Sequence, residues 1–258
     1  MKYFDVHTHT NMEPLLPLAD DIAKKCSDLN ISYVDIGIDI ATSKISIQHA
    51  KQHKNVYACV GIHPSDVVSL DMSSVFNELK QLLEHAKENK IVAIGETGLD
   101  YHTLGYDKNK QQLFFIEHIK LAKQYNLPLM VHVRDAHEDT INILKQHAQN
   151  VKTIIHCYSG DMTQTKKYIN LNVWFSIPGV ITFKNAIELR EVVKIIPIDK
   201  LLSETDAPWL TPVPFRGKTN SPEYIVYTVN EIAKVLNLTE TNIADQLFDN
   251  SLNIFNLK

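Results

Sequence analysis

The chain has 258 residues, 44% of them hydrophobic and 22% charged, which is typical of a globular protein with a substantial core. Its net charge of −4 argues against a protein that coats nucleic acid through an overall positive field. Three widely spaced cysteines without a CxxC pair argue against a disulfide framework and a thiolate zinc site. The opening stretch MKYFDVHTHT lacks the apolar segment of a signal peptide, and no apolar run approaches the roughly 20 residues of a membrane span. We therefore expect a cytoplasmic protein without a membrane partner.

Short β-rich apolar runs alternate with longer stretches of helical spacing along the chain. The predicted strands are Tyr3–His9, Ser32–Ile38, Val56–His63, Ile91–Thr97, Leu129–Arg134, Thr153–Cys157, Val173–Ile177 and Leu201–Thr205. The predicted helices include Leu18–Leu29, Ser73–Glu88, Lys108–Tyr125, Glu138–His147, Asn185–Ile195, Pro222–Leu236 and Ile243–Leu247, the last preceded by a cap-like Thr239.

Helical crossovers return the chain to the same edge of a sheet, so these strands are predicted to be parallel. Eight such units favour a TIM-type (β/α)8 barrel formed as a single domain over residues 1–258, and length agrees because such a barrel takes roughly 250 residues. An open flavodoxin-like sheet is the alternative.

The first predicted strand ends on a pair of histidines. His7 and His9 are two positions apart, so their side chains share one face of the strand. In a barrel both would point into the C-terminal mouth, where barrel enzymes place their chemistry. Two neutral imidazoles make half of a metal site, although an HxH pair is also found as hydrogen-bonded core histidines.

Ionisable residues recur at the ends of the other predicted strands, namely His63, Glu96, His132, His156 and Asp206. Apolar strands rarely carry such groups unless these are paired or bind metal. Four histidines and two carboxylates exceed what one tetrahedral ion uses, which predicts two divalent ions sharing a carboxylate, with Glu96 between them. The predicted ligands are His7, His9, Glu96, His132, His156 and Asp206. Mg2+, Mn2+ and Zn2+ all suit this set.

Seven short motifs, spread in order over nearly the whole chain, closely resemble the TatD family of metal-dependent deoxyribonucleases, a branch of the amidohydrolase superfamily. They are Asp5–His9 (DVHTH), Gly61–Pro64 (GIHP), Gly95–Tyr101 (GETGLDY), His132–Ala136 (HVRDA), His156–Gly160 (HCYSG), Glu204–Pro208 (ETDAP) and Arg216–Pro222 (RGKTNSP). The resemblance implies a TIM-type barrel, the same six metal ligands and hydrolysis of phosphodiester bonds in DNA, often from the 3′ end. The sequence departs from the family after Lys218, where members usually carry a second basic residue and an acidic one. That difference bears on substrate preference and not on the metal site.

The mechanism expected on this basis uses a water whose pKa the two ions lower, with Asp206 accepting its proton as general base. His63 is a candidate to contact the phosphate or protonate the leaving oxygen, or it is a turn histidine fixed by Pro64. Glu204 lies two residues before Asp206, where it orients a ligand or the water, or pairs with a buried cation.

Besides His63, four residues outside the ligand set are candidates for substrate contacts. Tyr101 and Trp209 follow strand ends and could stack on a base, with ordinary packing as the alternative. Arg216 and Lys218, in a loop after the last strand, could bind phosphates, with a solvated loop as the alternative.

Three further groups of residues are expected to have no catalytic role. Arg134 and Asp135 are expected to form an ion pair at the rim of the barrel mouth. Cys157 is expected to lie in the core. The histidines on helices, His49 and His118 among them, are expected at the surface or at an interface.

The predicted partner is DNA, as single strands or 3′ ends, with RNA left open and no obligate protein partner. One rival is a hydrolase of a small amide, a lactone or an aminoacyl-tRNA ester on the same scaffold, since fold and metals do not choose the substrate. Superfamily members acting on cyclic amides often bridge their ions with a carboxylated lysine, and Glu96 at the matching strand end favours the nuclease. Another rival is a catalytically silent nucleic-acid-binding protein, which would lack ligands, and none is missing here.

Overall fold

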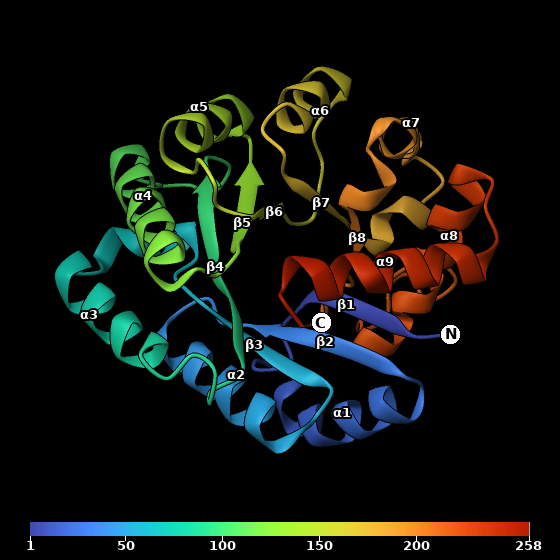
Figure 1. The fold of residues 1–258 in the computed structure, drawn as a ribbon, viewed down its shortest axis with the longest axis horizontal. Coiled ribbons are helices and arrows are strands. Elements are labelled where there is room, and N and C mark those ends of the chain that lie inside the picture. Colours follow the sequence, from blue (N-terminus) through green and yellow to red (C-terminus); the bar gives the residue numbers. More distant parts are fainter. Residues whose placement is uncertain (258) are drawn as a thin grey trace.

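The computed structural model describes residues 1–257 of the chain. Eight parallel strands neighbour one another in the order β1 to β8 (Figure 1). They are β1 Tyr3–Thr8, β2 Ile31–Ile36, β3 Val56–Val60, β4 Ile91–Asp100, β5 Leu129–Arg134, β6 Thr153–Ile155, β7 Trp174–Ile177 and β8 Leu201–Ser203. The segment after β8 returns to β1 through hydrogen bonds from the Asp206 N–H to the His7 carbonyl (3.0 Å) and from the His9 N–H to the Ala207 carbonyl (2.8 Å). The predicted TIM-type barrel is confirmed.

Helices follow the strands and surround the barrel (Figure 1). They are α1 Ala19–Asp28, α2 Ile40–Gln52, α3 Met72–Leu83, α4 Lys108–Tyr125, α5 His137–His147, α6 Met162–Ile169, α7 Ile187–Ile195, α8 Ile225–Leu236 and α9 Glu240–Ile254. Several begin at a side chain that accepts a hydrogen bond from the N–H three residues on, which satisfies a free backbone donor. These capping residues are Asp39, Asp71, Asp107, Asp161 and the predicted Thr239. None of the helices within residues 1–257 is long and apolar enough to cross a membrane.

The sequence analysis gave no range for α2 and α6, and it placed only Ile243–Leu247, in the first half of α9. Helix α2 shows no apolar stripe because its buried side includes Ser43, Ser46 and His49. The buried side of α9 continues past the predicted end with Asn250 and Ser251, which are also polar. Helical spacing of apolar residues is therefore a weak signal in both helices.

The apolar core has two layers, one between the strands and the helices and one inside the barrel. The outer layer combines buried side chains from strands and helices such as Ile94, Phe114, Phe115 and Tyr168. The inner layer takes side chains from all eight strands, and the end of α9 adds Ile254 and Phe255. The inner layer consists of Phe4, Val6, Val34, Ile36, Cys59, Val92, Ala93, Met130, Ile154, Trp174, Leu202, Ile254 and Phe255. The barrel below the mouth is thus filled with packed side chains, as in other TIM barrels.

Two strands lose their regular register where they carry predicted ligands. The pairing of β1 with β2 shifts between Asp5 and Thr8, and the pairing of β4 with β5 shifts between Ile94 and Thr97. Such irregularities change the direction in which a side chain points and are common at barrel rims and beside active sites. In this chain the two register shifts include His7 in β1 and Glu96 in β4.

Gly95 is required by the backbone beside Glu96. Its φ is +143°, a region that L side chains rarely adopt, and an added Cβ would lie 2.4 Å from the Met130 carbonyl oxygen. A Cβ at Gly61 would in turn meet the Gly95 backbone at 2.5 Å. β3, β4 and β5 therefore approach too closely here for any side chain, and this packing fixes the backbone next to Glu96.

Replacing Gly95 tests this close approach. We expect Gly95→Ala to lower the free energy of unfolding by about 1–3 kcal/mol, because the new methyl group overpacks against Met130. The matched control is Gly105→Ala, whose φ is +80° but whose added Cβ meets nothing within 4 Å. Urea denaturation of both variants measures the difference, and equal losses would show that the packing contributes nothing.

Candidate metal centre

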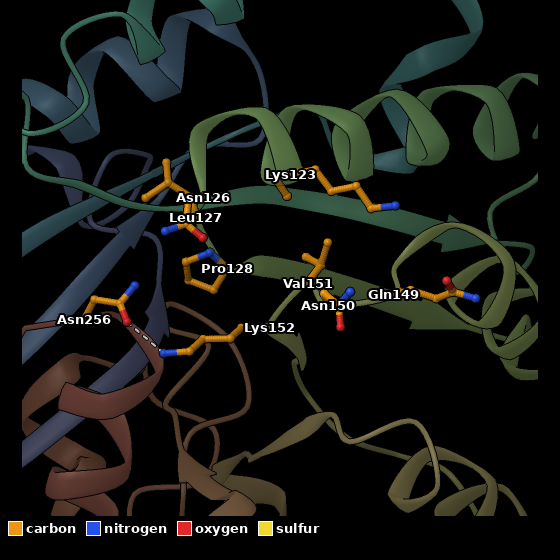
Figure 2. A pocket seen from close by; sticks show the side chains of 10 residues that line it. Lys123, Asn126, Leu127, Pro128, Gln149, Asn150, Val151, Lys152 and Asn256 are labelled. Carbon is orange, nitrogen blue, oxygen red and sulfur yellow. Dashed lines mark hydrogen bonds between the residues drawn. The ribbon is translucent and has the colours of Figure 1, made fainter.

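The six predicted ligands converge at the C-terminal mouth of the barrel. Five of them line a hollow of about 380 Å³ that also includes His63, Arg134 and Trp209. The sixth, His7, is fully buried beneath it. A larger hollow of about 650 Å³ lies at the opposite end of the barrel, around Lys123 and Lys152 (Figure 2), but no histidine, cysteine or carboxylate is among its lining residues. The acid–base and metal-binding groups are concentrated at the mouth.

The buried carboxylate of Glu96 lies between two pairs of imidazole nitrogens. Its Oε2 is 3.4 Å from His7 Nε2 and 3.6 Å from His9 Nε2. Its Oε1 is 2.9 Å from both His132 Nδ1 and His156 Nε2. Within the pairs, the nitrogens are 3.1 Å and 3.2 Å apart. Each oxygen of the Glu96 carboxylate thus faces a different pair of imidazole nitrogens.

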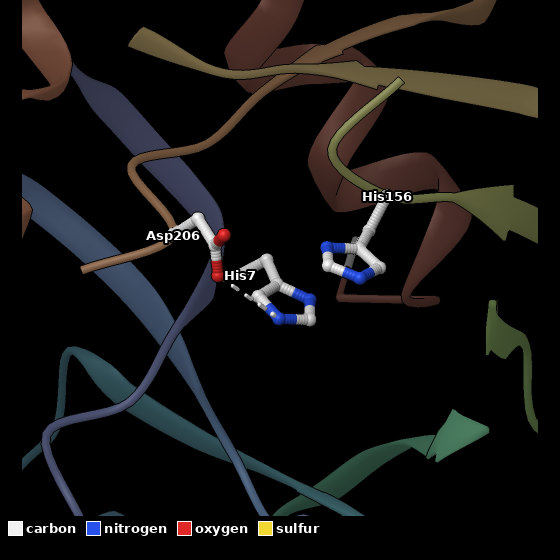
Figure 3. A group of neighbouring side chains, drawn as sticks. All are labelled: His7, His156 and Asp206. Carbon is white, nitrogen blue, oxygen red and sulfur yellow. Dashed lines mark ion pairs between the residues drawn. The ribbon is translucent and has the colours of Figure 1, made fainter. Parts of the chain in front are cut away.

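Asp206 completes one side of this cluster. Its Oδ1 is 3.7 Å from His7 Nε2 and 3.5 Å from His9 Nε2. Figure 3 shows this carboxylate beside the His7 imidazole, which stacks on His156 with ring centroids 3.8 Å apart. Asp206 and Cys157, the residue after His156, have φ values of +53° and +44°, in the left-handed region that is costly for most residues other than glycine.

Three of the histidines have an acceptor at the ring nitrogen that points away from Glu96. His9 Nδ1 is 3.0 Å from the Ile36 carbonyl oxygen, and His132 Nε2 is 3.3 Å from Asp100 Oδ2. His156 Nδ1 faces Glu204 Oε1 at 3.6 Å. A neutral imidazole that donates from one nitrogen presents a lone pair at the other, which is how metal-binding histidines are oriented. The donor set therefore fits divalent cations on both sides of Glu96.

The charge of this cluster also fits cations. Burial, followed by the neighbouring His156, lowers the pKa of His7 to about 3, so that it stays neutral. Burial also acts to lower the pKa of His9, His132 and His156, but hydrogen bonds and charges from the surrounding carboxylates outweigh it and raise the pKa of each. Burial opposes ionisation of Glu96, yet the histidines hold its pKa well below the usual range. The buried negative charge attracts protons when no metal is bound.

His63 lies beyond the end of β3, where it caps a turn and also lines the hollow, while its contact with substrate stays a prediction. Its Nδ1 accepts a hydrogen bond from the Ser65 N–H at 3.2 Å, which caps the short helix Pro64–Ser69. A neutral imidazole with an accepting Nδ1 carries its proton on Nε2. That Nε2 is 3.4 Å from Glu96 Oε1 and faces the hollow. His63 is therefore positioned as a hydrogen-bond donor, although it could join Glu96 and His132 around an ion if this proton were lost.

Comparison with known proteins identifies the family. A sequence model described as TatD related DNase matches residues 4–256. The chain belongs to the TatD-related DNase family. A protein of Mycoplasma genitalium named as an uncharacterized metal-dependent hydrolase is 40% identical over 261 residues, covering 99% of each chain. Bacillus subtilis YabD, which has the same description, is 38% identical over 256 residues, covering 98% of this chain and 99% of YabD.

Solved structures of this family have the same architecture. The TatD homologue YjjV of Escherichia coli is 26% identical with a TM-score of 0.92, covering 99% of this chain and 98% of YjjV. A TatD family hydrolase of Entamoeba histolytica, at 21% identity and a TM-score of 0.88 over 99% and 98% of the two chains, shares the fold. The resemblance drawn from the sequence motifs is confirmed, and the chain is a metal-dependent hydrolase of this family.

Glu204 is fully buried behind the ligands. Its Oε1 accepts a hydrogen bond from the Cys157 N–H at 2.7 Å and faces His156, as described above. Burial is the largest of the influences that raise its pKa. This position agrees with the predicted orienting role, and no buried lysine or arginine contacts it in the described chain.

Sequence reasoning missed two carboxylates that position the ligands. Asp100 contacts His132 and accepts hydrogen bonds from the N–H groups of His102 and Thr103 at 2.9 Å and 3.0 Å. Asp5, fully buried, accepts from the N–H groups of His7 (3.2 Å) and Thr205 (2.9 Å), and so holds the segment before Asp206 against β1. Both residues belong to motifs quoted above, Asp5 as the first residue of DVHTH and Asp100 as the aspartate of GETGLDY, so an acidic residue in the same motif as a ligand was the available signal.

The other predicted substrate contacts lie outside the hollow. The Tyr101 hydroxyl donates to Asp139 at 2.9 Å. The Arg216 guanidinium lies 4.3 Å from the centroid of the Phe183 ring, and Lys218 Nζ lies 5.5 Å from that of Phe215. Tyr101, Arg216 and Lys218 are not among the residues that line the metal centre. Their contact with substrate stays a prediction.

Two expectations for the rim of the mouth were wrong. Asp135 pairs with His102, at 2.8 Å between Oδ2 and Nδ1, and not with Arg134. Adjacent residues at a strand end point in different directions, and Arg134 instead lines the hollow. Cys157 is only half-buried and lines a separate hollow with Tyr158 and Phe183, because the chain leaves β6 before it.

His49 and His118 are buried and not at the surface. His49 Nδ1 is 3.0 Å from Asp35 Oδ2, which lies beneath the loop after His9. His118 Nε2 accepts the Ile62 N–H at 3.1 Å and so supports the backbone before His63. Helical position alone did not reveal that these polar side chains face the barrel.

Removal of Asp100 tests its positioning role. We expect Asp100→Ala to weaken divalent-metal binding by about 10-fold to 100-fold, because His132 loses the carboxylate that orients its ring. Isothermal titration with Mn2+ or Zn2+ measures the affinity. An exposed residue away from the mouth supplies the control, Asp245→Ala. An unchanged affinity in Asp100→Ala would rule the role out.

Metal affinity should also depend on pH. The pKa values of His9, His132 and His156 are raised in the metal-free protein, so a cation competes with protons for these rings up to a higher pH than at an ordinary imidazole. We expect affinity to rise from about pH 6 to about pH 8, with protons released on binding. Titrations in buffers of different ionisation enthalpy count those protons. Metal binding that releases no protons and whose affinity does not change with pH would contradict this account.

Proposed function

We propose that the chain is a deoxyribonuclease that hydrolyses phosphodiester bonds in DNA from free 3′ ends, using two divalent cations held by His7, His9, Glu96, His132, His156 and Asp206. The observation that carries the proposal is the Glu96 carboxylate, which presents one oxygen to each of two histidine pairs. Two-metal phosphodiesterases and nucleases hold ions roughly 3.5–4 Å apart around such shared ligands. Mg2+, Mn2+ and Zn2+ are the candidates, since imidazole and carboxylate suit all three.

The six ligands would hold divalent cations, whose positive charge would lower the pKa of a water and stabilise the phosphoryl oxygens. Asp206, which lies beside His7 and His9, would accept the proton of this water. Burial opposes its ionisation, but the hydrogen bond from His9 and the charges of the histidines hold its pKa below the usual value. It is therefore an ionised carboxylate at neutral pH, as a proton acceptor must be.

His63 and Glu204 assist from opposite sides of the centre. The Nε2–H of His63 faces the hollow and donates a hydrogen bond to a phosphoryl or leaving oxygen. Glu204 holds the ring of His156 from behind. The acidic chain and the location of the centre at the barrel mouth favour strand ends or short single strands over long duplex as substrate.

The test is release of nucleotides from 3′-labelled single-stranded DNA by metal-stripped protein with added Mg2+, Mn2+ or Zn2+. We expect release that requires metal and falls by about 10²-fold to 10⁴-fold in Asp206→Ala, because the proton acceptor is lost. Asp245→Ala is the matched control, as an exposed aspartate on α9. A substrate with a blocked 3′ end tests the direction of hydrolysis, and an RNA strand tests the preference for deoxyribose.

No release with any metal, from protein shown to bind two ions, would overturn the nuclease. The same centre would then act on a small amide, a lactone or an aminoacyl-tRNA ester. Binding of DNA without hydrolysis, together with full metal occupancy, would instead indicate a catalytically silent binding protein.

A further inference from the structure

Trp209 is an exposed aromatic side chain in a hollow lined mainly by histidines, carboxylates and other polar residues. It is 50% exposed and lines the metal centre together with Asp206. Its ring is inclined by 68° to that of His9, with centroids 5.3 Å apart, so His9 does not stack on the indole. Its backbone is fixed, because its N–H donates to the Asp206 carbonyl at 3.0 Å and its carbonyl accepts from the buried Asn220 side chain at 2.6 Å. The chain holds an indole with free surface at the edge of the metal centre.

Arg134 is an unpaired cation in the same hollow. It stands at the end of β5, is exposed, and has no carboxylate partner in the described chain. The lining carboxylates are Glu96, Asp100 and Asp206, with three negative charges between them. Two divalent cations would make the net charge of the hollow positive, and Arg134 adds a further positive charge. The loaded centre would therefore attract an anion and hold it beside an aromatic surface.

We propose that Trp209 and Arg134 form one substrate-positioning site, in which an unpaired nucleobase stacks on the Trp209 indole and a phosphate of the same strand lies against Arg134. This inference rests on the proposed function and deepens it. A base can stack on a side chain only when it has left its own duplex stack, so the site selects single-stranded ends. It also requires a base, and it disfavours phosphodiesters that lack one.

The first test compares two oligonucleotides that differ only in the terminal residue, one with thymine and one abasic. The wild-type protein should have a KM about 5-fold to 150-fold lower for the base-bearing end, the range expected for stacking of one base on an aromatic ring. Trp209→Ala should lose this discrimination, and Trp209→Phe should keep part of it. Tyr106→Ala removes an exposed aromatic outside the hollow and should behave as wild type.

The second test measures the charge contributed by Arg134. Arg134→Gln should raise KM and reduce the slope of log affinity against log salt by about 0.7, the value for one phosphate contact on a single strand. Lys87→Gln removes an exposed lysine in the turn before β4, at the end of the barrel opposite the mouth, and should leave the slope unchanged.

A binding readout separates the inference from the proposed function. The chain has two tryptophans, so in Trp174→Phe the indole emission comes from Trp209 alone. Dithymidine phosphate should quench this emission, and the same sugar phosphate without bases should not. Hydrolysis that proceeds with full base discrimination in Trp209→Ala would reject the inference and leave the nuclease intact. Quenching without any hydrolysis would reject the nuclease and retain the positioning site.

Discussion

The buried carboxylate of Glu96 is the constraint around which the mouth of the barrel is built. It carries a negative charge in a place that burial disfavours, and it holds that charge because imidazole nitrogens surround both of its oxygens. A buried charge is stable only when it is paired and hydrogen-bonded or bound to metal. The surrounding carboxylates, Glu96 among them, raise the pKa of His9, His132 and His156, so this cluster favours positive charge next to the carboxylate. Divalent cations on its two sides would supply that charge.

The surrounding structure keeps this cluster rigid. Gly95 allows β4 to lie against β5 next to Glu96. A carbonyl oxygen and two carboxylates face the outer nitrogens of His9, His132 and His156. The apolar plug inside the barrel supports the mouth from below. Catalytic groups held by such packing and outer contacts need little reorganisation when substrate binds.

The sequence predicted the barrel and the residues of the centre better than it predicted how they are held. Alternation of side chains along a strand and the convergence of strand ends were enough to bring His7, His9 and Glu96 together, although β1 and β4 both shift register there. Contacts such as that of His132 with Asp100, 32 residues away, depend on which strands become neighbours and cannot be read from local spacing. The same holds for Arg134, whose expected partner Asp135 pairs with His102, and for α2, whose buried face is polar.

The most direct test of this account is anomalous diffraction from crystals soaked with Mn2+. The account predicts two peaks roughly 3.5–4 Å apart, one on each side of the Glu96 carboxylate, and the loss of both in Glu96→Ala. One of them should lie near His7, His9 and Asp206, and the other near His132 and His156. A single peak, or two peaks of which neither contacts Glu96, would contradict the shared carboxylate and with it the two-metal centre.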